Sequence, residues 1–143
     1  MASPAVPDPT MLAPVERLAR FMAGGEDDPL AFFMPRGVTI FDNRSPFVFA
    51  GADAVARWAA RFFEAHPGYV ELRHEFGPAQ DFENLGDQAY FSLPTTWTWR
   101  RAGRSFHETG GWAFVLRRHV GAWRIESHGW AVTSFTVLGA DSN

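Results

Sequence analysis

The fold is decided by residues 89–137, which read AYFSLPTTWTWRRAGRSFHETGGWAFVLRRHVGAWRIESHGWAVTSFTV. Aromatic and β-branched residues alternate with small or polar ones along almost the whole stretch, which is typical of strands with two different faces. Ala102-Gly103 and Val120-Gly121 interrupt the alternation with residues suited to tight turns. The pattern therefore predicts an antiparallel meander of three long strands, Ala89–Arg101, Ser105–Arg118 and Ala122–Val137.

The preceding residues predict helices and shorter strands. Apolar residues at helical spacing indicate one helix between Met11 and Met22, a short second helix from Leu30 to Met34, and a third that carries Trp58. We expect short strands at Val38–Phe41 and Phe47–Phe49 and a long strand at Tyr69–Phe82. The fold class is α+β, with three helices packed on a strongly curved, mainly antiparallel sheet. No linker divides the chain, so we expect a leader at 1–9, one domain at 10–138 and a tail at 139–143.

Composition excludes several kinds of chemistry. A chain of 143 residues with 46% hydrophobic and 15% aromatic residues can fold as one domain without a metal or a disulfide. Cysteine and lysine are both absent, which excludes thiol nucleophiles, cysteine-ligated zinc and lysine Schiff bases. The net charge of −3 argues against a nucleic-acid partner. No apolar run is long enough to span a membrane and no secretory signal is visible, so we expect a cytoplasmic protein.

Four stretches, in this order, resemble the nuclear transport factor 2-like superfamily, which includes ketosteroid isomerase and the SnoaL-like polyketide cyclases. They are residues 24–30, the Val38–Asp42 strand with the following Pro46 and Gly51, residues 86–90, and the run Trp123-Arg124-Ile125-Glu126-Ser127-His128. The resemblance covers Met11 to Val137. It implies a cone in which a bent sheet wraps the helix that carries Trp58. The enclosed cavity would hold a small hydrophobic ligand, and no cofactor would be required.

The resemblance also gives Asp42 a role. Asp42 falls where ketosteroid isomerases carry their general-base aspartate, opposite an oxyanion hole of tyrosine and protonated aspartate. Those two positions read Leu18 and either Gly111 or Ala113 here, so ketosteroid isomerisation by that mechanism is not expected. A second interpretation is that Asp42 only stabilises a turn through its side chain, since Asn43, Arg44 and Ser45 follow it.

Strand parity leaves two interpretations of the sheet. In the first, the aromatic face (Trp97, Trp99, Trp112 and Trp123) packs on the helices and His128 points to solvent. In the second, the opposite face, which mixes polar and small side chains with a few aromatic ones, lines the cavity. The resemblance favours the second, which brings in Tyr90, Thr96, His107, His128 and Trp130. The aromatic face would then need a second copy of the chain as cover, and we would expect a homodimer. A β-bulge would reverse the alternation locally, so that side chains from both sets would point to the same side of the sheet.

These patterns lead to a functional hypothesis. We expect a small-molecule pocket with Asp42 and His128 as the catalytic proton-transfer residues, since a partly buried imidazole titrates near neutrality. Its substrate-binding residues would be Trp58, Tyr90, Thr96, His107 and Trp130. No His-Glu-x-x-His motif or dense cluster of His and Asp points to a metal. The alternative is a non-catalytic ligand-binding or dimerisation module of the same fold.

Overall fold

The computed structural model describes residues 5–25, 28–65 and 70–139. The expected leader and tail, and the start of the expected strand at Tyr69, lie partly outside these residues. Two α-helices are present, α1 (Pro9–Met22) and α2 (Ala54–Ala65), and a single 3₁₀ turn, η1 (Pro29–Ala31), replaces the short helix expected at Leu30–Met34. Of the described helices, none is long and apolar enough to cross a bilayer.

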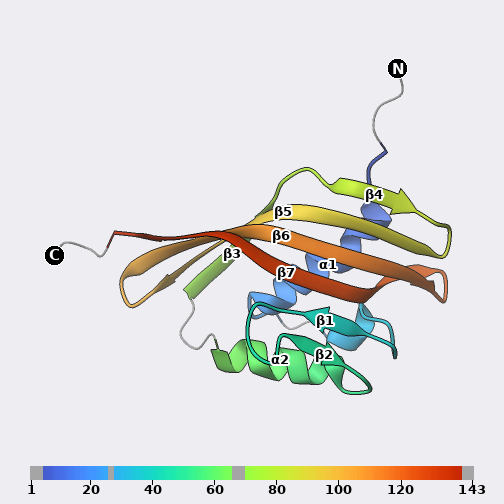
Figure 1. Ribbon diagram of the computed structural model, residues 1–143, viewed down its shortest axis with the longest axis horizontal. Coiled ribbons are helices and arrows are strands. Elements are labelled where there is room, and N and C mark those ends of the chain that lie inside the picture. The colour runs from blue at the N-terminus through green and yellow to red at the C-terminus, as the bar shows by residue number, and fades with distance from the viewer. Residues whose placement is uncertain (1–4, 26–27, 66–69, 140–143) are drawn as a thin grey trace.

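Seven strands form one mixed, mostly antiparallel sheet (Figure 1). They are β1 (Thr39–Phe41), β2 (Val48–Ala50), β3 (Val70–Phe76), β4 (Gln80–Asn84), β5 (Gln88–Arg101), β6 (Arg104–His119) and β7 (Ala122–Leu138). Their order is β2-β1-β7-β6-β5-β3, and β4 pairs with β5 beyond the end of β3. Among the paired strands of the described residues, β1 and β7 alone run parallel to each other. The expected α+β class, with a mainly antiparallel sheet, is confirmed.

In place of the single strand expected over Tyr69–Phe82 there are two strands, because Gly77-Pro78 interrupts the extended structure. Both β3 and β4 pair with β5, on either side of Pro94. Proline has no amide hydrogen to donate to a neighbouring strand. The backbone N–H of Gly77 donates to the Pro94 carbonyl at 2.7 Å, which fixes the position of the break.

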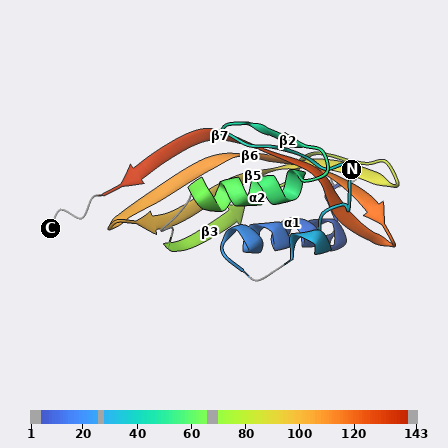
Figure 2. The same cartoon turned by 90° about the horizontal axis from the view of Figure 1, so that it is seen from below.

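The aromatic face of the sheet packs on the helices and forms the core. Figure 2 shows the sheet arching over α1 and α2. Trp97, Trp99, Trp112 and Trp123 are each at most 6% exposed, and Val15, Leu18 and Trp58 face them from the helices. The prediction that a second copy of the chain covers this face is therefore wrong, because the chain's own helices cover it.

Two β-bulges in β7 decide which of its side chains point inward. Val115 pairs with Ser127 but Leu116 pairs with Ile125, so Glu126 is an extra residue on β7. An extra residue moves every later side chain to the opposite face. His128 and Trp130 therefore share the inner face with Trp123 and Ile125, although simple alternation separates them. Both parity interpretations were partly wrong: the aromatic face is the core, and His128 points inward with it.

Candidate active site

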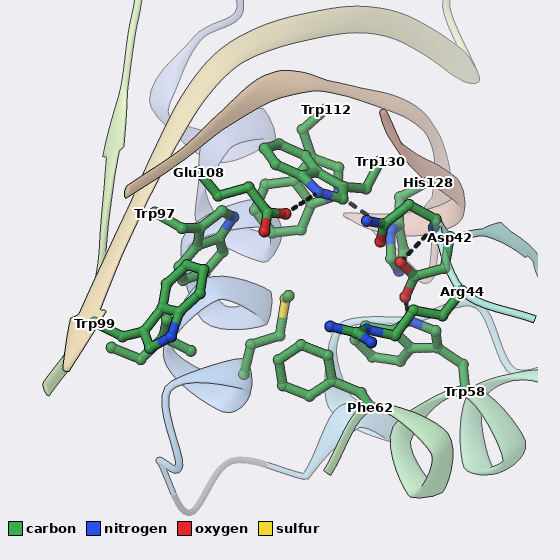
Figure 3. Close-up of a pocket in the computed structure, with 13 residues that line it drawn as sticks. Asp42, Arg44, Trp58, Phe62, Trp97, Trp99, Glu108, Trp112, His128 and Trp130 are labelled. Carbon is green, nitrogen blue, oxygen red and sulfur yellow. Dashed lines mark hydrogen bonds between the residues drawn. The ribbon is translucent and has the colours of Figure 1, made fainter. Parts of the chain in front are cut away.

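A pocket lies between the concave face of the sheet and α2, at the end of β1 (Figure 3). Its cavity volume is about 50 Å³, and all the space between its lining atoms, including the part open to solvent, amounts to about 560 Å³. Most of its wall is aromatic or aliphatic, and its polar side chains come from the β1–β2 connection, β6 and β7. The lining residues are Met22, Asp42, Asn43, Arg44, Trp58, Phe62, Leu72, Trp97, Trp99, Glu108, Trp112, His128 and Trp130.

His128 is a buried imidazole whose tautomer is fixed by a tryptophan. Its side chain is 3% exposed, and the indole N–H of Trp112 donates to Nδ1 at 3.1 Å. An indole nitrogen can only donate, so Nδ1 must be the acceptor and Nε2 must carry the proton. Nε2 is buried and has no hydrogen-bond partner among the described residues. A buried N–H is rarely left without a partner, so this one calls for an explanation.

Burial also keeps this imidazole neutral. Desolvation lowers the pKa of His128 from 6.5 to about 3. The ring packs edge-on against Trp58, with centroids 5.0 Å apart, and lies against Phe33 and Phe114. At neutral pH His128 is therefore a hydrogen-bond donor through Nε2 rather than a charged imidazolium, which differs from the near-neutral titration expected from its sequence alone.

Asp42 follows β1 and presents a carboxylate to the same pocket. The indole N–H of Trp58 donates to Oδ2 at 2.9 Å, and the backbone N–H of Asn43 donates to Oδ1 at 2.7 Å. The Asn43 contact is a local turn interaction, as one of the two interpretations of Asp42 expects. The Trp58 contact comes from α2 and holds the carboxylate at the pocket wall. A carboxylate has about four acceptor positions, so it retains capacity beyond these two contacts.

Glu108 is a polar pocket residue that the sequence analysis did not single out. It lies on β6, and its Oε1 accepts a hydrogen bond from the indole N–H of Trp130 at 2.8 Å. Burial raises the pKa of Glu108 above that of an exposed glutamate, and the charge of Asp42 adds to this. The Trp130 hydrogen bond and the charge of Arg44 act in the opposite direction. The sequence does contain a signal for Glu108: it alternates in step with Phe106 and Trp112, so the three side chains lie on the same face of the strand.

The two carboxyl groups and the imidazole of the pocket follow one pattern. Asp42, Glu108 and His128 each accept a hydrogen bond from the indole N–H of a different tryptophan. In Figure 3, dashed lines mark hydrogen bonds among the residues around the pocket. Each indole is also part of the pocket wall. Tryptophan thus supplies both apolar surface and an oriented donor, which fixes the three polar groups without placing a formal charge beside them.

Four of the seven predicted site residues share this pocket, and three do not. Asp42, Trp58, His128 and Trp130 line it. The other three, Tyr90, Thr96 and His107, lie on the opposite face of β5 and β6, because inward positions on those strands are held by the aromatic residues. The expectation that His107 and His128 meet in one cavity is therefore wrong. Thr96 instead lies 3.4 Å from Thr109, hydroxyl to hydroxyl, on that outer face.

No metal-binding cluster is visible in the described part of the chain. Within residues 5–25, 28–65 and 70–139, no three His, Cys, Asp or Glu side chains lie close enough to hold a metal ion. Asp42, Glu108 and His128 line one pocket, but each is directed by its own indole donor.

The tautomer of His128 should depend on Trp112. Replacing Trp112 with Phe keeps an aromatic ring in the wall but removes the only donor bonded to Nδ1 among the described residues. We expect the wild type to show a single Nε2–H tautomer and Trp112→Phe to show a mixture, as measured by imidazole nitrogen NMR shifts. Trp97→Phe, in the same wall, should leave the tautomer unchanged. Identical His128 shifts in the wild type and Trp112→Phe would contradict this assignment.

The sequence matches no protein-family model and no curated protein sequence. Solved structures do match over most of the chain. A type 2 hexachlorocyclohexane dehydrochlorinase, LinA, is 12% identical, with a TM-score of 0.67 over 89% of this chain and 88% of its own. A candidate scytalone dehydratase from Novosphingobium aromaticivorans is 13% identical, with a TM-score of 0.64 over 87% and 85%. A candidate ketosteroid isomerase from Shewanella frigidimarina is 18% identical, with a TM-score of 0.66 over 87% and 96%.

These likenesses bear on the fold, since all three identities are low. They agree with the arrangement described above, in which two helices pack on the concave face of a seven-stranded curved sheet. The resemblance noted between Met11 and Val137 is confirmed at that level. The chain has the nuclear transport factor 2-like fold, also known as the cystatin-like fold.

Proposed function

We propose that this protein is a cofactor-independent enzyme that moves a proton to or from carbon in a hydrophobic carbonyl compound. The observation that carries the proposal is the pairing, in one pocket, of the Asp42 carboxylate with the unpartnered, buried Nε2–H of His128. A base and a hydrogen-bond donor are the two groups that enolisation requires. Buried polar groups without a structural partner call for an explanation, and a ligand oxygen supplies one.

Asp42 is the base in this proposal. Its carboxylate removes a proton from the carbon next to the substrate carbonyl, and negative charge develops on the carbonyl oxygen. His128 donates its Nε2–H to that oxygen, and Trp112 holds the ring in the tautomer that can donate. A neutral imidazole can serve as such an electrophile, as it does in other proton-transfer enzymes. Because burial lowers the pKa of His128 to about 3, the imidazole is neutral at neutral pH and acts as a neutral hydrogen-bond donor.

The pocket wall indicates the kind of substrate. Indole and phenyl rings of Trp58, Phe62, Trp97, Trp99 and Trp112 line it, so a flat, apolar molecule with one or two oxygen atoms would bury its surface favourably. The names of the three similar structures point the same way. A dehydrochlorinase, a dehydratase and an isomerase all denote reactions in which a proton leaves carbon.

Asp42→Asn tests the base. Nitrobenzisoxazole is a suitable probe, because removal of its one acidic C–H opens the ring to a coloured cyanophenolate without any other reagent. We expect Asp42→Asn to lower kcat/KM for this probe by about 100-fold, the usual contribution of a positioned general base. Asparagine still offers an oxygen to the Trp58 indole, so the fold should be retained, which circular dichroism can verify.

Asp81→Asn provides a matched control, since Asp81 is an exposed aspartate on β4 outside the pocket. It should match the wild type. A wild-type rate no faster than that of acetate buffer, or an Asp42→Asn variant as active as the wild type, would overturn the proposal. Saturable binding of the probe without turnover would instead identify a non-catalytic ligand-binding protein.

A further inference from the structure

Glu108 is not explained by the roles given to Asp42 and His128. Its carboxyl group is partly buried in the pocket that Trp97, Trp99, Trp112 and Trp130 line. Burying a carboxyl group is unfavourable unless its contacts repay the lost hydration. Among the described residues its side chain accepts a hydrogen bond from Trp130 alone, and glutamine would accept that bond equally well without a charge. A structural role therefore accounts for an acceptor at this position but not for a titratable acid.

The surroundings of Glu108 make it the acid of the pocket. The β1–β2 connection brings Asp42 and Arg44 toward it, and β7 brings the neutral His128. The remaining elements that line the pocket contribute no charge: α1 gives Met22, α2 gives Trp58 and Phe62, β3 gives Leu72, and β5 gives Trp97 and Trp99. Desolvation and the nearby Asp42 carboxylate raise the pKa of Glu108 and outweigh the Arg44 charge and the Trp130 hydrogen bond. Glu108 thus keeps its proton to a higher pH than an exposed glutamate.

We propose, building on the function proposed above, that Glu108 is the general acid that protonates an oxygen leaving group, and that the reaction is an elimination. The substrate class is then a hydrophobic β-hydroxy carbonyl compound. Figure 3 shows Glu108 and Asp42 extending into the pocket from different walls. A molecule lying between them would present its acidic C–H to one carboxylate and its leaving oxygen to the other carboxyl group. Isomerisation needs no such second acid, since no bond to oxygen is broken.

The step balances without an oxidant or reductant. Asp42 takes the proton from the α-carbon, and the C–H electron pair becomes the new C=C bond. The C–O bond to the β-carbon breaks, and its electron pair stays on the hydroxyl oxygen. Glu108 gives its proton to that oxygen, which leaves as water. Asp42 ends protonated and Glu108 ionised, and exchange with solvent at the open side of the pocket restores both.

Two probes that differ only in their leaving group test this role. Benzisoxazole and nitrobenzisoxazole undergo the same C–H removal with cleavage of the N–O bond, but the unsubstituted phenolate is much the poorer leaving group. A general acid matters most where the leaving group is poor. We expect Glu108→Gln to lower kcat/KM for benzisoxazole by about 100-fold and for nitrobenzisoxazole by no more than about threefold. Glu75→Gln, at an exposed position on β3, should change neither rate.

The pH profile gives a readout that a structural role would not move. Wild-type turnover of benzisoxazole should fall as pH rises through the raised pKa of Glu108, and Glu108→Gln should lack this decline. An equal loss on both probes, or an unchanged pH profile, would show that Glu108 only supports the pocket and would overturn this inference. Asp42→Asn should slow both probes equally. If instead Asp42→Asn has no effect, the proposed function fails, whatever Glu108 does.

Discussion

Acidification is expected to destabilise the folded protein through His128, by about 1.4 kcal/mol per pH unit. The pKa of His128 falls from 6.5 in a solvated chain to about 3 in the fold because the ring is fully buried. Below about pH 6.5 the unfolded chain binds a proton here and the folded protein does not, so stability is lost as pH falls toward 3. The loss attributable to His128 between about pH 6.5 and pH 4 is roughly 3 kcal/mol.

Urea denaturation at a series of pH values measures this loss. Carboxylates also contribute to acid denaturation, so the quantity to compare is the pH slope of the wild type against that of His128→Asn. Asparagine keeps an oxygen near the position of Nδ1 for Trp112 and cannot titrate. The variant should lack the roughly 3 kcal/mol component, while His119→Asn, at the end of β6, should retain it. Parallel slopes for the wild type and His128→Asn would show that His128 is accessible to protons in the fold.

Both α-helices and most of the strands could be predicted from the sequence because their signals are local. Alternation along β5 and β6 marks two faces, and the glycines at positions 103 and 121 have positive φ angles in the turns where they were expected. The apolar spacing around Trp58 correctly places α2. These features depend on residues a few positions apart, so a single sequence carries them.

The direction of side chains in β7 could not be predicted, because it depends on pairing. Two residues, Glu126 and Thr133, are unmatched by β6, and nothing in their types distinguishes them from their neighbours. Glu126 finds a partner on the outer face, where Arg117 and Gln88 donate to its carboxylate. With Glu126 held on the outer face as the extra residue of the bulge, the side chain of His128 lies on the inner face. A parity argument without the bulge therefore assigns the residues after it to the wrong face.

The site was predicted in part for a related reason. Asp42 was recognised from its place after the first strand and His128 from its residue type, and both line the pocket. Glu108 was missed because a lone carboxylate in a strand reads as a solvent-facing residue. Its alternation in step with Phe106 and Trp112 pointed to the inner face, and the burial of Gly110 and Trp112 in the structure shows that this position faces inward. The pairing of each polar group with an indole N–H likewise requires contacts between distant strands.

Gly110 links the second bulge to the pocket. The β6–β7 register shifts between the pairs Thr109–Ser134 and Gly110–Val132, so the two backbones approach closely there. A Cβ atom at Gly110 would lie 2.9 Å from Cη2 of Trp130 and far inside the van der Waals contact distance of the Ala131 carbonyl oxygen. At the next residue, Gly111, a Cβ would meet nothing within 4 Å. The two adjacent glycines thus offer a matched pair of substitutions.

Gly110→Ala should lower the free energy of unfolding by about 3 kcal/mol, because a backbone oxygen cannot move aside as a flexible side chain can. Gly111→Ala should be neutral or stabilising by about 0.5 kcal/mol, since alanine restricts the unfolded chain more than glycine does. Urea denaturation of both variants measures the difference. The clash also pushes on the Trp130 ring that donates to Glu108, so Gly110→Ala should slow benzisoxazole more than nitrobenzisoxazole. Equal stabilities for the two variants would mean that β6 and β7 are further apart at Gly110 than the bulged register requires.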